Sequence, residues 1–334
     1  MKVLIVNQNE VRRLLPMREC MDVMTETLSA LARGEAIQPL RTVMRLPEKI
    51  GALGVMPSFL ANIESMGLKV ISVFPGNHGT KYDSHQGAVL LFEARHGQLL
   101  SLMDASAITA IRTAAVSGVA TRLLARENAA TLAILGSGVQ ARTHLAAMIE
   151  ARKITRVSVW GRDGDRAREF AERETKRHGI TVNAVSTVKA AVANADIICT
   201  TTAAPEPILM GEWIAKGTHV NAVGSSVPFT RELDTTAVKN ARLYVDRRES
   251  TVNEAGDFLF PKKEGAIDDS HIVGEIGEIL VGTVEGRRTA DEITLFKSLG
   301  LGVEDLAAAS HVYAKAIQSG AGVSVELGGE RDDG

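Results

Sequence analysis

The chain predicts an α/β fold, with a doubly wound parallel sheet in one domain and a second domain of the α+β type. Between residues 131 and 245, short apolar runs alternate with helical or polar segments, which is typical of parallel strands joined by crossover helices. The first hundred residues instead hold closely spaced strand candidates with short turns, which favours an antiparallel or mixed sheet. A length of 334 residues is enough for two domains.

The N-terminal region begins with an apolar run at residues 1–6, which predicts a strand because it is too short for a signal peptide. A helix is expected from about residue 17 to 33, started near Pro16 and ended by Gly34. His96-Gly97 predicts a hairpin turn. The expected strands are 40–46, 52–56, 68–74, 87–94 and 99–103, followed by a helix at 106–126.

The middle of the chain supplies the parallel sheet. Its expected strands are 131–135, 156–160, 181–185, 195–200, 219–223 and 242–245, and its clearest helices are 140–151, 165–178 and 187–194. A last helix, 303–319, is expected to return to the first domain, since a domain that starts and ends the chain keeps its termini together. The expected domains are 1–112 with 311–334, and 113–310.

Composition excludes several classes of protein. The hydrophobic content of 45% and charged content of 23% are ordinary for a globular chain, and a net charge of −2 gives no reason to expect nucleic acid or a membrane as partner. No apolar stretch is expected to reach the ~20 residues that a membrane helix needs. Cys20 and Cys199 have no metal or redox spacing, which indicates a reducing, cytoplasmic location.

The most informative segment is a glycine-rich turn between a strand and a helix. Residues 131–135 run directly into Gly136-Ser137-Gly138-Val139-Gln140-Ala141, which is G-x-G-x-x-A in the strand–turn–helix context of a dinucleotide site. The first glycine permits the tight turn, and the second lets the backbone approach a pyrophosphate. The helix N-terminus then offers free N–H groups to the phosphates. The segment predicts a bound nicotinamide or flavin nucleotide.

The end of the next strand bears on the choice of cofactor. An NAD enzyme usually has Asp or Glu there to accept from the ribose hydroxyls, whereas this chain has Gly161-Arg162-Asp163. A guanidinium matches a phosphate bidentately, so Arg162 favours NADP(H), with NAD(H) possible. The alternative is that Arg162 is a solvated loop charge and Asp163 serves the ribose.

Several further segments carry a resemblance to a known family. They are Val55-Met56-Pro57, Gly67-Leu68-Lys69-Val70, His85-Gln86-Gly87, Ile111-Arg112-Thr113-Ala114-Ala115, Asn221-Ala222-Val223-Gly224 and Phe296-Lys297-Ser298-Leu299-Gly300. With the glycine-rich turn, they resemble the ornithine cyclodeaminase/μ-crystallin family of nicotinamide-dependent enzymes, and the stretch 206–234 is most similar to the μ-crystallin, or ketimine reductase, branch. The resemblance implies a Rossmann domain, a substrate-binding and dimerisation domain built from both ends of the chain, and a homodimer.

The resemblance also implies the substrate-binding residues. It places Arg112 on the substrate carboxylate and makes Lys69 a proton donor, whereas the pattern alone allows a surface arginine and a solvated strand lysine. A buried lysine has a lowered pKa and can exchange protons near neutrality. Arg41 matches a second carboxylate-binding cation, although a small shift in alignment would select Arg45. The expected cofactor-binding residues are Thr113, Gly136, Ser137, Gly138, Val139, Gln140, Arg162, Thr202, Gly224 and Ser298.

Ser226 is the informative departure from the family. Cyclodeaminases carry an aspartate at this substrate-binding position, and a serine hydroxyl cannot replace a carboxylate as acid or base. The first hypothesis is therefore an NAD(P)H-dependent reductase of an imino acid, or the reverse amino-acid dehydrogenase, with Lys69 and Arg112 catalytic. The alternatives are an ornithine or lysine cyclodeaminase and an NADPH-dependent binding protein without turnover.

A metal site is not expected. The eight histidines, His78 among them, include no pair at the i, i+4 spacing of helical metal ligands. The expected partner is a small imino or amino acid.

Overall fold

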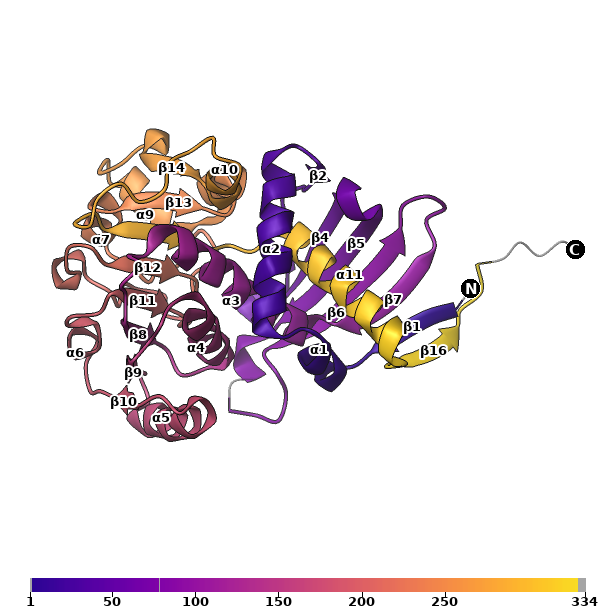
Figure 1. Ribbon diagram of the computed structural model, residues 1–334, viewed down its shortest axis with the longest axis horizontal. Coiled ribbons are helices and arrows are strands. Elements are labelled where there is room, and N and C mark those ends of the chain that lie inside the picture. Colours follow the sequence, from indigo (N-terminus) through magenta and orange to yellow (C-terminus); the bar gives the residue numbers. More distant parts are fainter. Residues whose placement is uncertain (1, 78, 330–334) are drawn as a thin grey trace, which may run out of the picture. The chain divides into compact units, whose positions relative to one another are not determined.

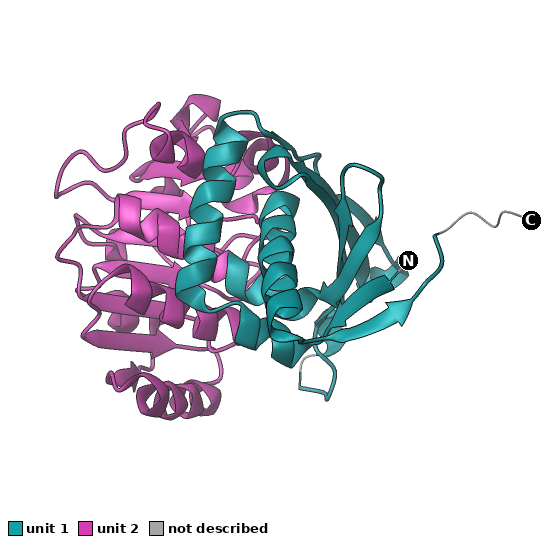
Figure 2. Ribbon diagram, turned by 45° about the vertical axis from the view of Figure 1, so that its right-hand side comes forward, with its two compact units in different colours: residues 1–112, 301–334 teal, residues 113–300 magenta. Residues whose placement is uncertain are grey.

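The computed structural model describes residues 2–77 and 79–329. The chain divides into two compact units, unit 1 with residues 1–112 and 301–334, and unit 2 with residues 113–300 (Figure 2). Each unit contains an eight-stranded sheet. The α/β fold class, with a parallel sheet in one part and an α+β arrangement in the other, is confirmed.

The second boundary between the units differs from the expected one. The first lies at 112/113, as the sequence predicted, but the second lies at 300/301 and not at 310/311. The expected position falls inside a single helix, α11 (Gly302–Ser319). A helix is continuous through its i→i−4 hydrogen bonds, so it stays whole within unit 1.

Unit 2 contains the parallel sheet. Its strands, in spatial order, are β10 (Val182–Ala184), β9 (Arg156–Trp160), β8 (Thr131–Leu135), β11 (Ile197–Thr200), β12 (His219–Ala222), β15 (Thr294–Lys297), β13 (Arg242–Val245) and β14 (Ile272–Glu275), and every neighbouring pair is parallel. The strand order reverses between β8 and β11. This is the doubly wound Rossmann arrangement, in which ligands bind at the carboxyl ends of the strands near the reversal.

Two strands of unit 2, β14 and β15, were not expected from the sequence. Both have only four residues, and a short apolar run such as Ile293-Thr294-Leu295-Phe296 cannot be assigned to strand or helix by its pattern alone. The helices of unit 2 are α4 (Val139–Ala151), α5 (Gly164–His178), α6 (Val188–Val192), α7 (Thr235–Lys239), α8 (Arg248–Glu254), α9 (Gly256–Lys263) and α10 (Ile276–Leu280). Figure 1 shows α4 and α6 on opposite sides of the sheet.

Unit 1 contains a mixed sheet. Its strands, in spatial order, are β16 (Val323–Glu326), β1 (Lys2–Val6), β7 (Leu99–Asp104), β6 (His85–Glu93), β5 (Ser65–Val73) and β4 (Ala52–Leu60), with β2 (Ala36–Ile37) and β3 (Thr42–Arg45) both paired to β4. Among the described strands of this sheet, β1 and β7 are the one parallel pair, and the other pairs are antiparallel. The expected strands of the first hundred residues are present. The sequence does not predict β16, since the helix before it is the last expected element.

Two helices cover one face of this sheet. The helices of unit 1 are α1 (Gln8–Leu14), α2 (Met17–Ala32) and α11, of which α2 packs on α11 and α11 packs on β4, β5 and β6 (Figure 1). Met56, Lys69, Val89 and Met103 are buried on the covered face. They alternate along their strands with half-buried or exposed residues, as the two-residue period of a strand requires.

The helix α3 (Ala105–Leu124) carries the chain across the first boundary. The expectation that no stretch reaches membrane-spanning length was wrong here, because this helix has 20 residues and a mean hydropathy of 1.2 in its most apolar window. However, 83% of that window is buried inside the protein. A helix that is apolar all round is equally what a protein core requires, and the burial identifies α3 as a core helix.

Candidate active site

The covered face of unit 1 contains a cluster of four buried charges. Lys69 comes from β5, Arg112 from α3, and Glu304 and Asp305 from the first turn of α11, and each of these residues is at most 3% exposed. Lys69 Nζ lies 2.6 Å from Asp305 Oδ2. Arg112 Nε lies 2.9 Å from Asp305 Oδ1, and its Nη1 lies 2.8 Å from Glu304 Oε2. Two cations and two carboxylates therefore balance in charge, as buried ions require.

The environment of Lys69 lowers the pKa of its ammonium group towards neutrality. Burial lowers the pKa of Lys69 to about 8, and the charges of Arg112 and Arg41 act in the same direction, while Asp305 opposes the shift. An ammonium group with this pKa is protonated at neutral pH but gives up its proton far more readily than an ordinary lysine. The sequence pattern had allowed a solvated lysine, and the structure excludes that alternative.

The strand register distinguishes Arg41 from Arg45. On β4, Met56 pairs with Lys69, whereas Arg45 on β3 pairs with Ala52 near the other end of β4. Arg41 directly precedes β3, at the end of that strand close to Met56, and its charge acts on Lys69. Arg45 is exposed. Unit 1 therefore brings Arg41, Lys69 and Arg112 together and leaves Arg45 apart.

Unit 2 gathers most of the expected cofactor residues along one edge of its sheet. The glycine-rich turn follows β8, Arg162 follows β9, Thr202 follows β11, Gly224 follows β12, and Ser298 follows β15. Because the strands are parallel, these positions all lie at their carboxyl ends, where a doubly wound sheet binds its ligand. Thr113 is buried on α3, and Ser226 is half-buried in the loop after β12, two residues beyond Gly224.

The glycine-rich turn has the backbone that a dinucleotide needs. Gly136 has a φ of +122°, and a Cβ there would lie 2.7 Å from Thr201 Oγ1, so only glycine fits. A Cβ on Gly138 would meet open space, so this glycine leaves room beside the turn rather than filling a packed site. The N-terminus of α4 has no side-chain cap among the described residues, so its first N–H groups can bind a phosphate. The turn therefore fits a nucleotide pyrophosphate.

Asp163, which follows β9, caps the next helix. Asp163 Oδ1 accepts from the backbone N–H groups of Asp165 and Arg166 at 3.0 and 3.1 Å, so it is the N-cap of α5. Arg162 is exposed and has no ion-pair partner among the described residues. A hollow beside this loop is lined by Trp160, Thr187 and Trp213, among others.

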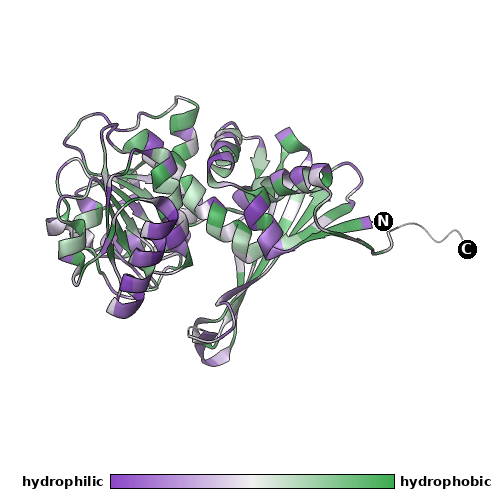
Figure 3. Ribbon diagram, turned by 60° about the horizontal axis from the view of Figure 1, so that its bottom comes forward, coloured by the Kyte–Doolittle hydropathy of each residue, from purple (hydrophilic) through white to green (hydrophobic). Residues whose placement is uncertain are grey.

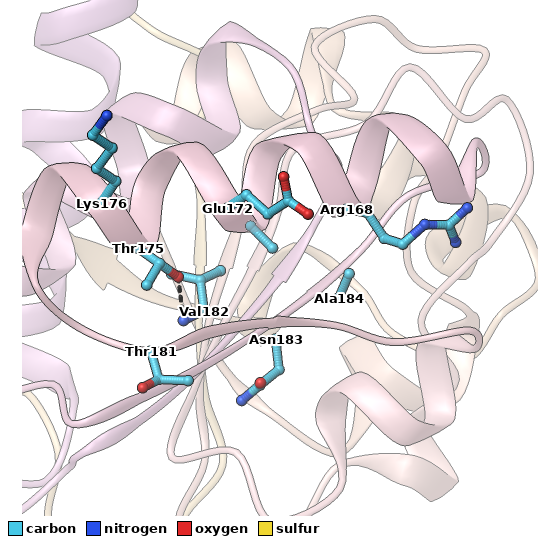
Figure 4. Close-up of a pocket in the computed structure, with 9 residues that line it drawn as sticks. Arg168, Glu172, Thr175, Lys176, Thr181, Val182, Asn183 and Ala184 are labelled. Atoms are coloured by element: carbon cyan, nitrogen blue, oxygen red, sulfur yellow. Dashed lines mark hydrogen bonds between the residues drawn. The ribbon is translucent and has the colours of Figure 1, made fainter.

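Another hollow in unit 2 has no part in the site. It lies between α5 and the edge strand β10, and contains none of the expected residues (Figure 4). Thr175 Oγ1 there accepts from the N–H of Val182 and joins helix to strand. Within residues 2–77 and 79–329, no group of three or more His, Cys, Asp or Glu side chains could hold a metal ion, and His78 lies outside the described residues.

The sequence analysis did not identify the buried carboxylates of either unit. Glu304 and Asp305 stand in an otherwise apolar run, Gly302-Val303-Glu304-Asp305-Leu306-Ala307, and such a pair inside a buried helix is a usable signal. Glu232 and Asp257 of unit 2 are also buried, at 0% and 2% exposure, and no sequence pattern marks them.

Known proteins resemble most of the chain. The profile of the ornithine cyclodeaminase/mu-crystallin family matches residues 1–320. The Delta(1)-pyrroline-2-carboxylate reductase of Bacillus cereus is 37% identical over 97% of this chain and 100% of its own length. The ketimine reductase mu-crystallin of Mus musculus is 42% identical over 84% of this chain and 85% of its own.

A solved structure agrees with these matches. The Delta(1)-pyrroline-2-carboxylate reductase of Thermococcus litoralis, in complex with NADH and L-proline, superposes with a TM-score of 0.95 at 39% identity and covers 97% of this chain and 100% of its own. Profile, sequences and structure agree over both units. The chain therefore belongs to the ornithine cyclodeaminase/mu-crystallin family.

Proposed function

We propose that this protein is an NAD(P)H-dependent reductase that converts an imino acid to an amino acid, and that catalyses the reverse dehydrogenation. The observation that carries the proposal is the buried Lys69, which contacts Asp305 at 2.6 Å and has a pKa of about 8. The names of its relatives support cyclic imines, above all Δ1-pyrroline-2-carboxylate, as the first substrates to test.

Lys69 and the two arginines have different roles toward the substrate. Arg112 and Arg41 bind the substrate carboxylate, and Asp305 and Glu304 hold the Arg112 guanidinium in a fixed orientation. Lys69 holds the proton that ends on the substrate nitrogen. The bound dihydronicotinamide supplies the hydride that ends on the α-carbon. One hydride and one proton together convert C=N to CH–NH.

The experiment follows NADPH absorbance with Δ1-pyrroline-2-carboxylate, and with keto acids plus ammonia or methylamine. Turnover with at least one imine supports the proposal. A protein that binds NADPH and oxidises none of it in this panel is the alternative binding protein. The buried Lys69 disfavours that alternative, because burying an ammonium group is costly and binding alone does not need a proton donor.

The cyclodeaminase alternative depends on Ser226. This residue offers only a hydroxyl where ring closure needs a carboxylate. We expect no ammonia from ornithine or lysine with catalytic NAD. Release of ammonia together with proline, with no net use of cofactor, would make the chain a cyclodeaminase instead.

We further propose that NADP(H) is preferred over NAD(H). Arg162 is exposed and without an ion-pair partner among the described residues, while Asp163 caps α5 through one of its carboxylate oxygens. A charge-assisted contact to the 2′-phosphate is worth about 1.5–3 kcal/mol. Arg162→Ala should therefore narrow the difference between the dissociation constants of NADPH and NADH, and equal constants in the wild type would contradict the preference.

The uncovered face of the unit 1 sheet supports a homodimer. Six apolar residues form a row across this face, and each is paired with the next one on the adjacent strand. They are Pro57, Leu68, Leu90, Leu102, Ile5 and Val323. Among them Leu102, Ile5 and Val323 are 37%, 39% and 65% exposed. Figure 3 shows these strands as hydrophobic along much of their length. A patch that crosses a whole sheet indicates a protein interface.

Light scattering tests the homodimer. Leu102→Glu should shift the mass from dimer towards monomer, whereas Ile317→Glu on α11 changes an equally apolar exposed residue away from this face and should leave the dimer intact. A monomeric wild type would contradict the proposal. We also infer a cytoplasmic location, which the two buried free thiols, Cys20 and Cys199, support.

A further inference from the structure

Glu232 is a buried carboxylate of unit 2 with a full set of hydrogen-bond donors. Its Oε1 accepts from the N–H and the hydroxyl of Thr202 at 2.6 and 2.7 Å. Its Oε2 accepts from the hydroxyl of Thr200 at 2.6 Å and the N–H of Gly224 at 2.7 Å. Burial and the nearby Asp257 raise the pKa of Glu232, but two donors on each oxygen and the charge of Lys297 favour the ionised carboxylate. Two of the donors are backbone groups of different loops.

The two loops that Glu232 joins follow adjacent strands at the carboxyl edge of the sheet. Thr202 lies after β11 and Gly224 lies after β12. The fit at Gly224 is close, because a Cβ there would lie 2.5 Å from Glu232 Oε1 and 2.0 Å from the carbonyl oxygen of Thr202. The side chain therefore fixes the separation of the two loops as well as their conformation.

A second carboxylate holds Glu232 itself. Asp257 Oδ1 accepts from the backbone N–H groups of Glu232 and Leu233 at 2.8 and 3.0 Å. Asp257 Oδ2 lies 2.9 Å from Lys297 Nζ, and Lys297 donates to the carbonyl oxygens of Ala222 and Ser225. Lys297, at the end of β15, thus connects this network to Ala222 at the end of β12.

We propose that Glu232 is a positioning residue that shapes the half of the dinucleotide site that receives the nicotinamide mononucleotide. A doubly wound sheet consists of two mononucleotide-binding halves. In unit 2 the first half, β8 to β10, holds the glycine-rich turn and Arg162, and so takes the adenosine side. The second half begins with β11 and β12, whose loops Glu232 joins. The inference rests on the proposed function, since it assumes that the nucleotide is a nicotinamide dinucleotide.

Asp196 offers a matched control in the same sheet. It is also a carboxylate that accepts from two backbone N–H groups, those of Ala130 and Thr131, both at 2.9 Å. It lies just before β11 and joins the start of that strand to the start of β8, so it acts at the opposite edge of the sheet from the ligand. Asp196→Asn therefore removes a comparable clamp without touching the proposed site.

The experiment measures the dissociation constants of NADPH and of ADP-ribose for the wild type and for Glu232→Gln. A glutamine cannot accept from all four donors, so we expect the NADPH constant to rise about 10- to 100-fold while that of ADP-ribose changes less than about threefold. Asp196→Asn should leave the ratio of the two constants at its wild-type value. Thr200→Val removes one donor and keeps the carboxylate, so it should shift the NADPH constant in the same direction by a few-fold.

Thr200→Val keeps the test decisive if Glu232→Gln fails to fold. Equal weakening of both ligands, unchanged NADPH binding in Glu232→Gln and Thr200→Val, or the same selective loss in Asp196→Asn would overturn the positioning role. These outcomes leave the proposed function standing. A wild type that binds ADP-ribose but neither NADPH nor NADH would instead overturn both the proposed function and this inference.

Discussion

The buried charges of unit 1 and of unit 2 are held in different ways. In unit 1, Lys69 and Arg112 meet the side-chain carboxylates of Glu304 and Asp305. In unit 2, Glu232 accepts from two backbone N–H groups and two threonine hydroxyls, and Asp257 accepts from two further backbone N–H groups. Lys297 pairs with Asp257 and also donates to two backbone carbonyl oxygens. The first arrangement fixes cations that can act on a substrate, and the second fixes the shape of loops.

The difference shows that burial of a charged residue alone does not indicate catalysis. The partners help to decide the role. A backbone N–H or carbonyl group cannot titrate, so a network tied to four backbone N–H groups and two carbonyl oxygens holds loops in place, even though it includes the Asp257–Lys297 ion pair. Predictions for the two units therefore differ in what they measure. Changes in unit 1 should affect proton transfer and substrate binding, and changes in unit 2 should affect nucleotide binding and stability.

The largest effect is expected for Lys69→Met. If Lys69 supplies the proton, kcat should fall by about 10²- to 10⁴-fold, while the NADPH dissociation constant stays near the wild-type value because the nucleotide residues belong to unit 2. Stopped-flow absorbance and a fluorescence titration measure the two quantities. Lys81→Met, at an exposed lysine of the same unit, is the control. A Lys69→Met enzyme with near wild-type turnover would remove the catalytic role from the unit 1 cluster.

Arg112→Met should destabilise unit 1. It leaves two buried carboxylates with only Lys69 as a cation in the cluster, and breaking a buried ion pair costs about 3–5 kcal/mol. Denaturant unfolding measures this loss, and KM should rise in any folded fraction. Arg112→Lys keeps the charge but not the planar fork, so it should recover part of the stability and little of the substrate affinity. Full recovery of both would show that Arg112 acts only as a point charge.

Acid should destabilise unit 2 before unit 1. Burial lowers the pKa of His144 to about 4 and that of His219 to about 3, from an ordinary value of 6.5. Below pH 6.5 the unfolded chain therefore takes up protons that folded unit 2 does not, and stability falls by about 1.4 kcal/mol per pH unit for each histidine. Of the described histidines of unit 1, His96 and His311 are exposed or half-buried. Partial burial lowers the pKa of His85 as well, but this residue is not enclosed as His144 and His219 are, so the effect on unit 1 should be smaller.

Hydrogen exchange at pH 7 and pH 5 checks the order of unfolding. Amides of unit 2 should lose protection faster than those of unit 1 as the pH falls. His144→Gln keeps a neutral side chain at both pH values, so it should reduce the pH dependence in unit 2. Equal loss of protection in both units would contradict the assignment of the acid sensitivity to these histidines.

The smallest expected effect is a shift in the pH dependence of kcat/KM. Because Lys69 has a pKa of about 8 and must be protonated to act as an acid, kcat/KM for imine reduction should fall about tenfold per pH unit above pH 8. Asp305 opposes the lowering of this pKa, so Asp305→Asn should move the break to lower pH. A break that stays in place in Asp305→Asn would mean that another group titrates.

Much of the fold follows from local patterns in the sequence. The strand, glycine-rich turn and helix at residues 131–151 specify a dinucleotide site by themselves, because the turn needs a φ that glycine adopts and the helix N-terminus needs no side chain. The alternation of strands and helices likewise predicts the parallel sheet, and the short turns predict the mixed one. Short strands such as β15 could not be predicted, since four apolar residues do not distinguish strand from helix.

The candidate site depends on contacts between distant parts of the chain. The sequence pattern allows Lys69 to be either buried or solvated. The helix α11, more than two hundred residues later in the chain, packs over Lys69 and supplies Asp305. The same is true of Arg112, whose carboxylates come from that helix, and of Arg41, which the register of β3 and β4 brings close to Lys69. The sequence by itself determined the residue types and the local turns. The tertiary structure decided the burial and the partners, because both depend on chain segments that no local pattern connects.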